Sequence, residues 1–241
     1  MMPKSTTVLD TQVYSSTSAA SSKSTFSPTS YSDYVNPQWV ALLDLLDMNV
    51  RYERCEGAEL FTEDGRRILD FLSGYCVHNT GHNHPHIVGA LQKELEARGP
   101  VMLQSHVPEL AGELAKRLCG LAGGGLQKVF FCSSGSEGVE AAIKFARMNT
   151  RRDGLLCAKS AFHGLTAGAL SLMSDAFWRE GFGPLLADAA VVPFGDLAAL
   201  EKQLNSKRFA AFVVEPVQSE AGIFDGGGGD LPEDRDALCC G

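Results

Sequence analysis

The chain has 241 residues, of which 44% are hydrophobic and 21% are charged, a balance typical of soluble globular proteins. Its formal net charge of −8 at pH 7 argues against a surface that binds nucleic acid or an anionic membrane. No apolar run approaches the roughly 18 residues that suggest a membrane-spanning helix. The seven cysteines are odd in number and include no CxxC pair, so we expect free thiols and a cytoplasmic location.

Residues 1–32 are rich in Ser and Thr and poor in large apolar side chains. Such a segment buries too little apolar surface to offset its ordering entropy, so we predict a disordered tail. A transit peptide is the alternative interpretation. Against it, the first thirty residues contain no Arg, only Lys4 and Lys23, and they show no amphipathic periodicity.

The next segment, residues 33–95, predicts a helix followed by a β-hairpin. Asn36-Pro37 opens a short helical stretch, and residues 50–71 have the character of antiparallel strands. Glu63-Asp64-Gly65 carries the turn chemistry of a hairpin. An amphipathic helix is predicted over residues 87–96.

Residues 96–223 alternate apolar strands with helices. We predict helices over residues 109–118, 137–148 and 196–204 and somewhere within 164–180, and strands over residues 129–132, 155–158, 190–193 and 210–215. This alternation indicates an α/β fold with a mainly parallel sheet covered by helices on both faces. Ligands of such sheets bind beyond the carboxyl ends of the strands. A Gly-rich tail, residues 224–241, follows.

The most informative segment is KVFFCSSGSEGVEAAIKFAR, residues 128–147. It predicts a buried strand, a tight Ser/Gly turn and an amphipathic helix in succession. The first N–H groups of such a helix have no partner and form a phosphate site, which Gly135 lets the ligand approach and the Ser hydroxyls supplement. The alternative is an ordinary helix cap, because Ser134 and Glu137 have the spacing of a capping box.

Four histidines lie close together in the sequence and suggest a zinc site: His78, His82, His84 and His86. The alternative is a polar turn leading into a helix, shaped by Gly81 and Pro85. Spacing alone gives many false zinc assignments, and only Cys76 lies nearby as a further ligand. We therefore predict no metal.

Seven blocks between residues 34 and 223 occur in the order typical of one enzyme family: EGAELFTEDGRRILDFLSGY, NTGHNHPHIVGAL, SSGSEGVEAAIKFAR, AFHG, GFGPLL, VPFGDLAALE and AFVVEPVQSEAGI. In these blocks the chain resembles the N-terminal half of the class III, ornithine- and acetylornithine-aminotransferase-like, pyridoxal-phosphate aminotransferases. The resemblance implies the fold type I architecture of these transferases in incomplete form. Residues 33–95 would be the N-terminal segment, and residues 96–223 would be part of the large cofactor-binding domain.

The resemblance also implies a reaction and a site. The cofactor would be pyridoxal 5'-phosphate, the substrates an ornithine-like or other ω-amino donor and a 2-oxo acid, and the full-length family forms homodimers. The implied cofactor-binding residues are Ser134, Gly135, Ser136, Phe162, His163 and Glu215, with the Phe162 ring against the pyridine.

Some of these positions have other interpretations. Tyr75 and Glu220 match positions that face the substrate, although Tyr75 is equally interpretable as a half-buried structural tyrosine. Glu215 ends a strand and could instead form a salt bridge with a helix. Ser219 stands where the family usually has Gly, a departure that could reshape the loop before Glu220.

The 241 residues contain no block that matches the family's pyridinium-pairing aspartate or its Schiff-base lysine. Lys128, Lys144 and Lys159 lie in blocks whose family roles differ. We therefore expect no catalytic residue here and no activity from this chain alone. The alternative function is a non-catalytic, truncated homologue that binds a phosphate ligand weakly or pairs with a full-length subunit.

Overall fold

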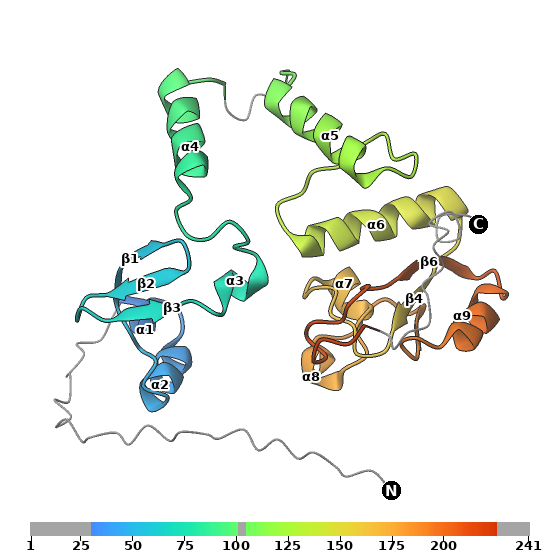
Figure 1. The fold of residues 1–241 in the computed structure, drawn as a ribbon. Helices are drawn as coiled ribbons and strands as arrows, with labels where there is room; N and C mark the ends of the chain where they lie inside the picture. The colour runs from blue at the N-terminus through green and yellow to red at the C-terminus, as the bar shows by residue number, and fades with distance from the viewer. Residues whose placement is uncertain (1–29, 101–104, 226–241) are drawn as a thin grey trace, which may run out of the picture. The chain divides into compact units, whose positions relative to one another are not determined.

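The computed structural model describes residues 30–100 and 105–225, and the chain divides into two units, Met1–Gln104 and Ser105–Gly241 (Figure 1). Most of the predicted tail lies outside the described residues, and Ser30–Ser32 belong to the first helix. The end of the Gly-rich tail, residues 226–241, also lies outside them. In the described part of the chain, no helix is both long and apolar enough to cross a membrane.

The first unit contains helices and a three-stranded antiparallel sheet of order β1-β2-β3. Its elements are α1 (Ser30–Tyr34), α2 (Pro37–Leu45), β1 (Tyr52–Glu56), β2 (Glu59–Thr62), β3 (Arg67–Leu69), α3 (Ser73–Cys76) and α4 (Pro85–Ala97). The predicted helix start is confirmed, because the Asn36 side chain accepts a hydrogen bond of 2.9 Å from the Trp39 N–H. The predicted hairpin turn is confirmed between β2 and β3.

The second unit is a three-layer α/β structure with a parallel sheet of order β5-β4-β6. Its elements are α5 (Glu109–Ala122), α6 (Gly135–Thr150), β4 (Gly154–Ala158), α7 (Ala167–Ser171), α8 (Ala176–Arg179), β5 (Ala189–Val192), α9 (Leu197–Leu204) and β6 (Phe209–Val213). This confirms the predicted α/β class. The single helix predicted within residues 164–180 is two short helices, α7 and α8.

The central strand β4 contributes side chains to both hydrophobic clusters of the core. All five of its residues are buried, and successive side chains point to opposite faces of the sheet. On one face Leu155 and Cys157 pack with Ile143 of α6, and on the other Leu156 packs with Val192 and Phe209. A strand that is buried on both faces has a continuous run of apolar residues, and this run allowed the strand at residues 155–158 to be predicted from the sequence.

The predicted strand over residues 129–132 is wrong, because the segment has no regular secondary structure. Phe130 is 63% exposed and Phe131 is 46% exposed. Strand propensity measures how well a side chain fits a paired and partly buried surface, and a strand needs neighbours for its N–H and C=O groups. Among the described residues, no strand pairs with this segment.

Candidate functional site

Helix α6 begins at the predicted Ser/Gly turn. Ser134 is its N-cap, with φ −149° and ψ 161°, and its Oγ accepts a hydrogen bond of 3.2 Å from the Glu137 N–H. Glu137 returns the interaction, since its Oε2 accepts from the Ser133 N–H at 2.6 Å. The capping interpretation is therefore correct in geometry. It does not exclude a ligand, because within the described chain the N–H groups of Gly135 and Ser136 meet no acceptor.

The loop that follows β4 lies directly against this turn. Gly164 has φ +123°, and a Cβ atom placed on it would overlap the hydroxyl of Ser136. Only a residue without a side chain permits this approach and this backbone conformation together. The FHG segment and the start of α6 are thus in contact.

Phe162 is held from two directions. Its backbone N–H donates a hydrogen bond of 3.0 Å to Glu215 Oε2, which lies just beyond the end of β6. Its ring meets the Trp178 ring edge-on, with centroids 5.3 Å apart and planes at 71°. The main chain and the ring of Phe162 are therefore both oriented before any ligand binds.

His163 is 9% exposed, and no hydrogen-bond partner of its Nε2 atom is found among the described residues. Burial lowers the pKa of His163 below its ordinary value, although the nearby Glu215 carboxylate and a backbone hydrogen bond with Val213 oppose this shift. The imidazole is thus neutral at pH 7. A buried polar atom without a hydrogen-bond partner is uncommon in folded proteins, and His84 Nδ1 is a second example in the described residues.

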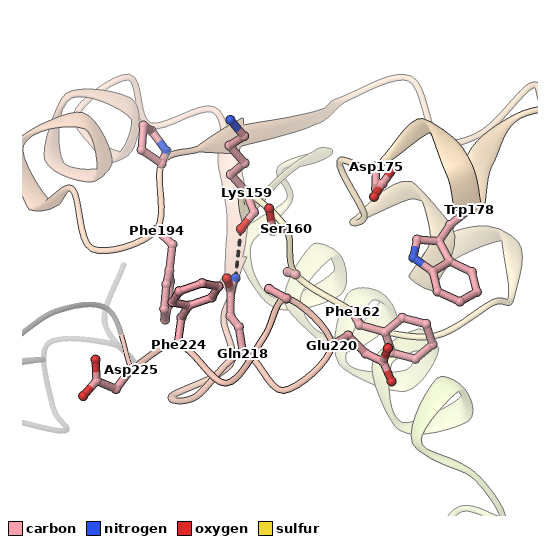
Figure 2. Close-up of a pocket in the computed structure, with 13 residues that line it drawn as sticks. Lys159, Ser160, Phe162, Asp175, Trp178, Phe194, Gln218, Glu220, Phe224 and Asp225 are labelled. Carbon is pink, nitrogen blue, oxygen red and sulfur yellow. Dashed lines mark hydrogen bonds between the residues drawn. The ribbon is translucent and has the colours of Figure 1, made fainter. Parts of the chain in front are cut away.

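A cleft of about 820 Å³ opens at the carboxyl ends of the strands (Figure 2). Phe162, Trp178 and Glu220 line it together with Gln218. Gln218 is itself fully buried, and its Nε2 donates a hydrogen bond of 2.9 Å to the carbonyl oxygen of Lys159, drawn dashed in Figure 2. This bond fixes the loop before Glu220 to the end of β4.

The second unit contains all but one of the site residues that the sequence predicts. Ser134, Gly135 and Ser136 form the turn, Phe162 and His163 lie in the adjoining loop, and Glu215 binds that loop. Glu220 lies in the cleft and is exposed. Tyr75 belongs to the first unit, where it lies in α3 with φ 56° and is 78% exposed rather than half-buried.

Sequence reasoning missed three residues of this region. Gln218 lies in a quoted block, but its burial could not be read from the sequence. Trp178 gave no signal beyond being one of two tryptophans. Glu140 could have been found, because it lies four residues after Ser136 and therefore on the same face of α6.

Within the histidine cluster, His82 and His78 form ordinary polar contacts, whereas His84 Nδ1 is buried and has no hydrogen-bond partner among the described residues. His82 Nε2 lies 2.7 Å from Asp70 Oδ2, and the His78 ring meets the His82 ring edge-on at 5.0 Å. The hydrogen bond from His82, with those from the Ser73 and Leu72 N–H groups, holds the pKa of Asp70 below its usual value. No group of three or more potential metal ligands is found in the residues that the structure describes.

Comparisons with known proteins show which proteins this chain is similar to. The sequence model of the family described as "Aminotransferase class-III" matches residues 44–226. "Aminotransferase PigE" of Serratia sp. (strain ATCC 39006) is 41% identical over 194 residues, which are 80% of this chain and 23% of that protein. The acetylornithine aminotransferase of Agrobacterium fabrum is 40% identical over 182 residues, 72% of this chain and 44% of that one.

Solved structures show the same likeness. The ornithine aminotransferase of Toxoplasma gondii superposes with a TM-score of 0.68 over 82% of this chain and 50% of its own, at 24% identity, which supports the fold. A thermostable (S)-enantioselective ω-transaminase of Thermomicrobium roseum gives a TM-score of 0.65 at 28% identity, over 74% of this chain and 46% of its own. The chain thus spans about half the length of these relatives, or less.

Proposed function

The chain belongs to the class III aminotransferases, and from this premise we propose that its second unit is the phosphate-binding and ring-binding part of a pyridoxal-phosphate site. The proposed reaction of the complete site transfers an amino group from an ornithine-like, acetylornithine-like or other ω-amino donor to a 2-oxo acid. When bound, the cofactor supplies the electron sink for this chemistry.

One observation carries the proposal: the loop of Phe162 touches the start of α6. The contact between Gly164 and Ser136 brings a stacking ring beside a helix N-terminus with free N–H donors. A phosphorylated aromatic ligand needs both features at once, whereas a plain helix cap needs neither the ring nor the buried histidine nitrogen.

The residues divide the binding task. Gly135 and Ser136 donate backbone N–H groups to the phosphate, and the Ser134 hydroxyl has a proton left to donate, because its oxygen acts as the acceptor in the cap. Phe162 covers a face of the pyridine. His163 offers its unpaired Nε2 atom to the bound ligand.

The carboxylates and Tyr75 take other roles in this proposal. Glu215 holds the Phe162 loop through the backbone N–H. Glu220, which lies in the cleft, is proposed to face the substrate. The same role is proposed for Tyr75 on the family likeness alone. The charge of Glu220 suits the ammonium group of an amino donor.

We also propose that the chain is inactive by itself. The 241 residues contain no match to the family's lysine and aspartate blocks. Lys159 borders the cleft, but its carbonyl is bound by Gln218 at the end of β4, and its side chain is exposed. We do not assign it the covalent role.

Two finer points complete the proposal. The described cysteines are all free thiols, namely Cys55, Cys76, Cys119, Cys132 and Cys157, which supports a reducing compartment such as the cytoplasm.

Pairing with a second subunit is proposed on the family likeness. Sedimentation at several chain concentrations measures it, and a chain that stays monomeric at all of them contradicts it.

Trp178 provides the direct test of the site, because it contacts Phe162. In a Trp39→Phe chain, Trp178 is the remaining tryptophan, and its emission reports binding of pyridoxal phosphate, pyridoxal and inorganic phosphate. We expect pyridoxal phosphate to bind most tightly. Phe162→Leu should weaken it by about 0.5–1.5 kcal/mol, the contribution of an aromatic pair. The control is Phe145→Leu, which removes an exposed aromatic ring on α6, away from the Phe162 loop. Equal binding of the three ligands contradicts the proposal.

A further inference from the structure

Glu140 connects α6 to the helix that follows the FHG loop. Its Oε1 accepts hydrogen bonds from the N–H groups of Gly168, at 2.8 Å, and Ala169, at 3.3 Å. A side chain of α6 therefore caps the first turn of α7.

Helix α7 has no cap of its own. Thr166, its N-cap residue, makes no side-chain bond to the α7 backbone. Gly168 and Ala169 are buried, so their N–H groups would otherwise lack a partner, which is costly away from water. The fit is close, because a Cβ atom on Gly168 would overlap the carboxylate of Glu140.

Two successive turns of α6 thus touch one segment. Ser136 contacts Gly164, and Glu140, four residues later on the same face, contacts Gly168 and Ala169. Phe162 comes two residues before Gly164, and its backbone N–H donates a hydrogen bond to Glu215. The distance from the phosphate turn to the Phe162 ring is therefore set through two contacts with α6.

The charge state of Glu140 favours this role. Burial raises the pKa of the carboxyl, but the hydrogen bonds from Thr166, Gly168 and Ala169 and the Lys144 ammonium outweigh it, so the pKa lies below its usual value. The group is ionised at neutral pH. Hydrogen bonds to an ionised acceptor are stronger than those to a neutral amide.

We propose that Glu140 is a positioning residue that holds the Phe162 loop at a fixed spacing from the phosphate turn through its hydrogen bonds to α7. The inference rests on the proposed function, because the spacing matters only to a ligand that uses both subsites. Glu140 itself touches neither. Its loss should weaken a ligand that spans phosphate and ring, and should leave binding of phosphate alone unchanged.

Two variants test this role in the Trp39→Phe chain. Glu140→Gln removes the charge at nearly constant shape, and Gly168→Ala displaces the carboxylate without altering it. The matched controls lie on α5. Glu113→Gln makes the same change at an exposed glutamate, and Gly112→Ala adds a Cβ atom that meets nothing within 4 Å.

Dissociation constants for pyridoxal phosphate and inorganic phosphate give the main result. We expect both test variants to bind pyridoxal phosphate about tenfold more weakly, with inorganic phosphate unchanged. The double variant should be no weaker than either single one, because both remove one contact. Equal loss of the two ligands, or no loss of either, overturns the proposal.

A measurement without ligand separates this inference from the proposed function. Hydrogen exchange of residues 162–164 reports the order of the Phe162 loop, beyond the N–H groups that Glu140 binds. Faster exchange there in Glu140→Gln, with the α5 controls unchanged, supports the positioning role. If the parent chain binds neither ligand, the proposed function fails, and unchanged exchange at residues 162–164 overturns the positioning role by itself.

Discussion

Gly164 lies against Ser136 with no room for a side chain between them. The contact joins the loop that follows β4 to the start of α6, so the proposed phosphate turn and the segment that carries the Phe162 ring lie against each other. A substitution at Gly164 therefore tests the site as a whole.

We predict that Gly164→Ala destabilises the chain by about 1–3 kcal/mol, because φ +123° strains any side chain and the methyl group overlaps Ser136. Urea unfolding measures the loss. Gly181→Ala is the matched control, since Gly181 also has positive φ, +83°, but an added Cβ there meets nothing within 4 Å. Equal destabilisation by the two variants would show that the contact with Ser136 is unimportant.

Gly135→Val should abolish the preference for pyridoxal phosphate over pyridoxal. An added Cβ at Gly135 meets nothing within 4 Å, so α6 should form normally while the branched side chain occupies the space that the phosphate needs. Each hydrogen bond to a charged group contributes about 1.5–3 kcal/mol, so the loss is measurable by titration. Far-ultraviolet circular dichroism checks the helix. If phosphate affinity survives the change, the turn is only a helix cap.

The 241-residue chain should form no covalent adduct with pyridoxal phosphate at a specific lysine and should show no turnover of ornithine with 2-oxoglutarate. The reason is that no lysine in the sequence matches the family's Schiff-base position. Borohydride reduction followed by peptide mass spectrometry measures the adduct, with Lys159→Ala as the control for the lysine that borders the cleft. A single dominant site of labelling, or turnover that depends on the cofactor, contradicts the prediction.

Stability should fall as pH drops below 6.5 because of His163. Burial holds the pKa of this imidazole below its ordinary value of 6.5 in the folded chain, so the unfolded chain binds the proton first. The free energy of unfolding is unaffected by His163 above that pH, declines below it, and levels off once the folded form is also protonated. Urea unfolding at a series of pH values measures the decline.

The control for this pH dependence is a pair of variants. His163→Gln should flatten the decline, whereas His106→Gln, in an exposed side chain, should leave it intact. Other titrating groups are common to all three chains, so the difference between the curves isolates His163. A decline that persists in His163→Gln assigns the effect elsewhere.

The sequence by itself determined the features that depend on neighbours along the chain. The cap and amphipathic face of α6 follow from residues within one or two turns, and the buried strand β4 follows from its unbroken apolar run. The family blocks predicted that Phe162, His163 and Glu215 belong to one site, without saying how these residues meet.

Only the tertiary structure decided contacts between segments that are distant in sequence. Trp178 against Phe162, Glu215 on the Phe162 N–H, and Glu140 on α7 each need the sheet to bring separate segments together. The same dependence made the strand prediction at residues 129–132 fail. A strand exists through its partners, so an apolar run with strand propensity remains irregular where the described chain offers it none.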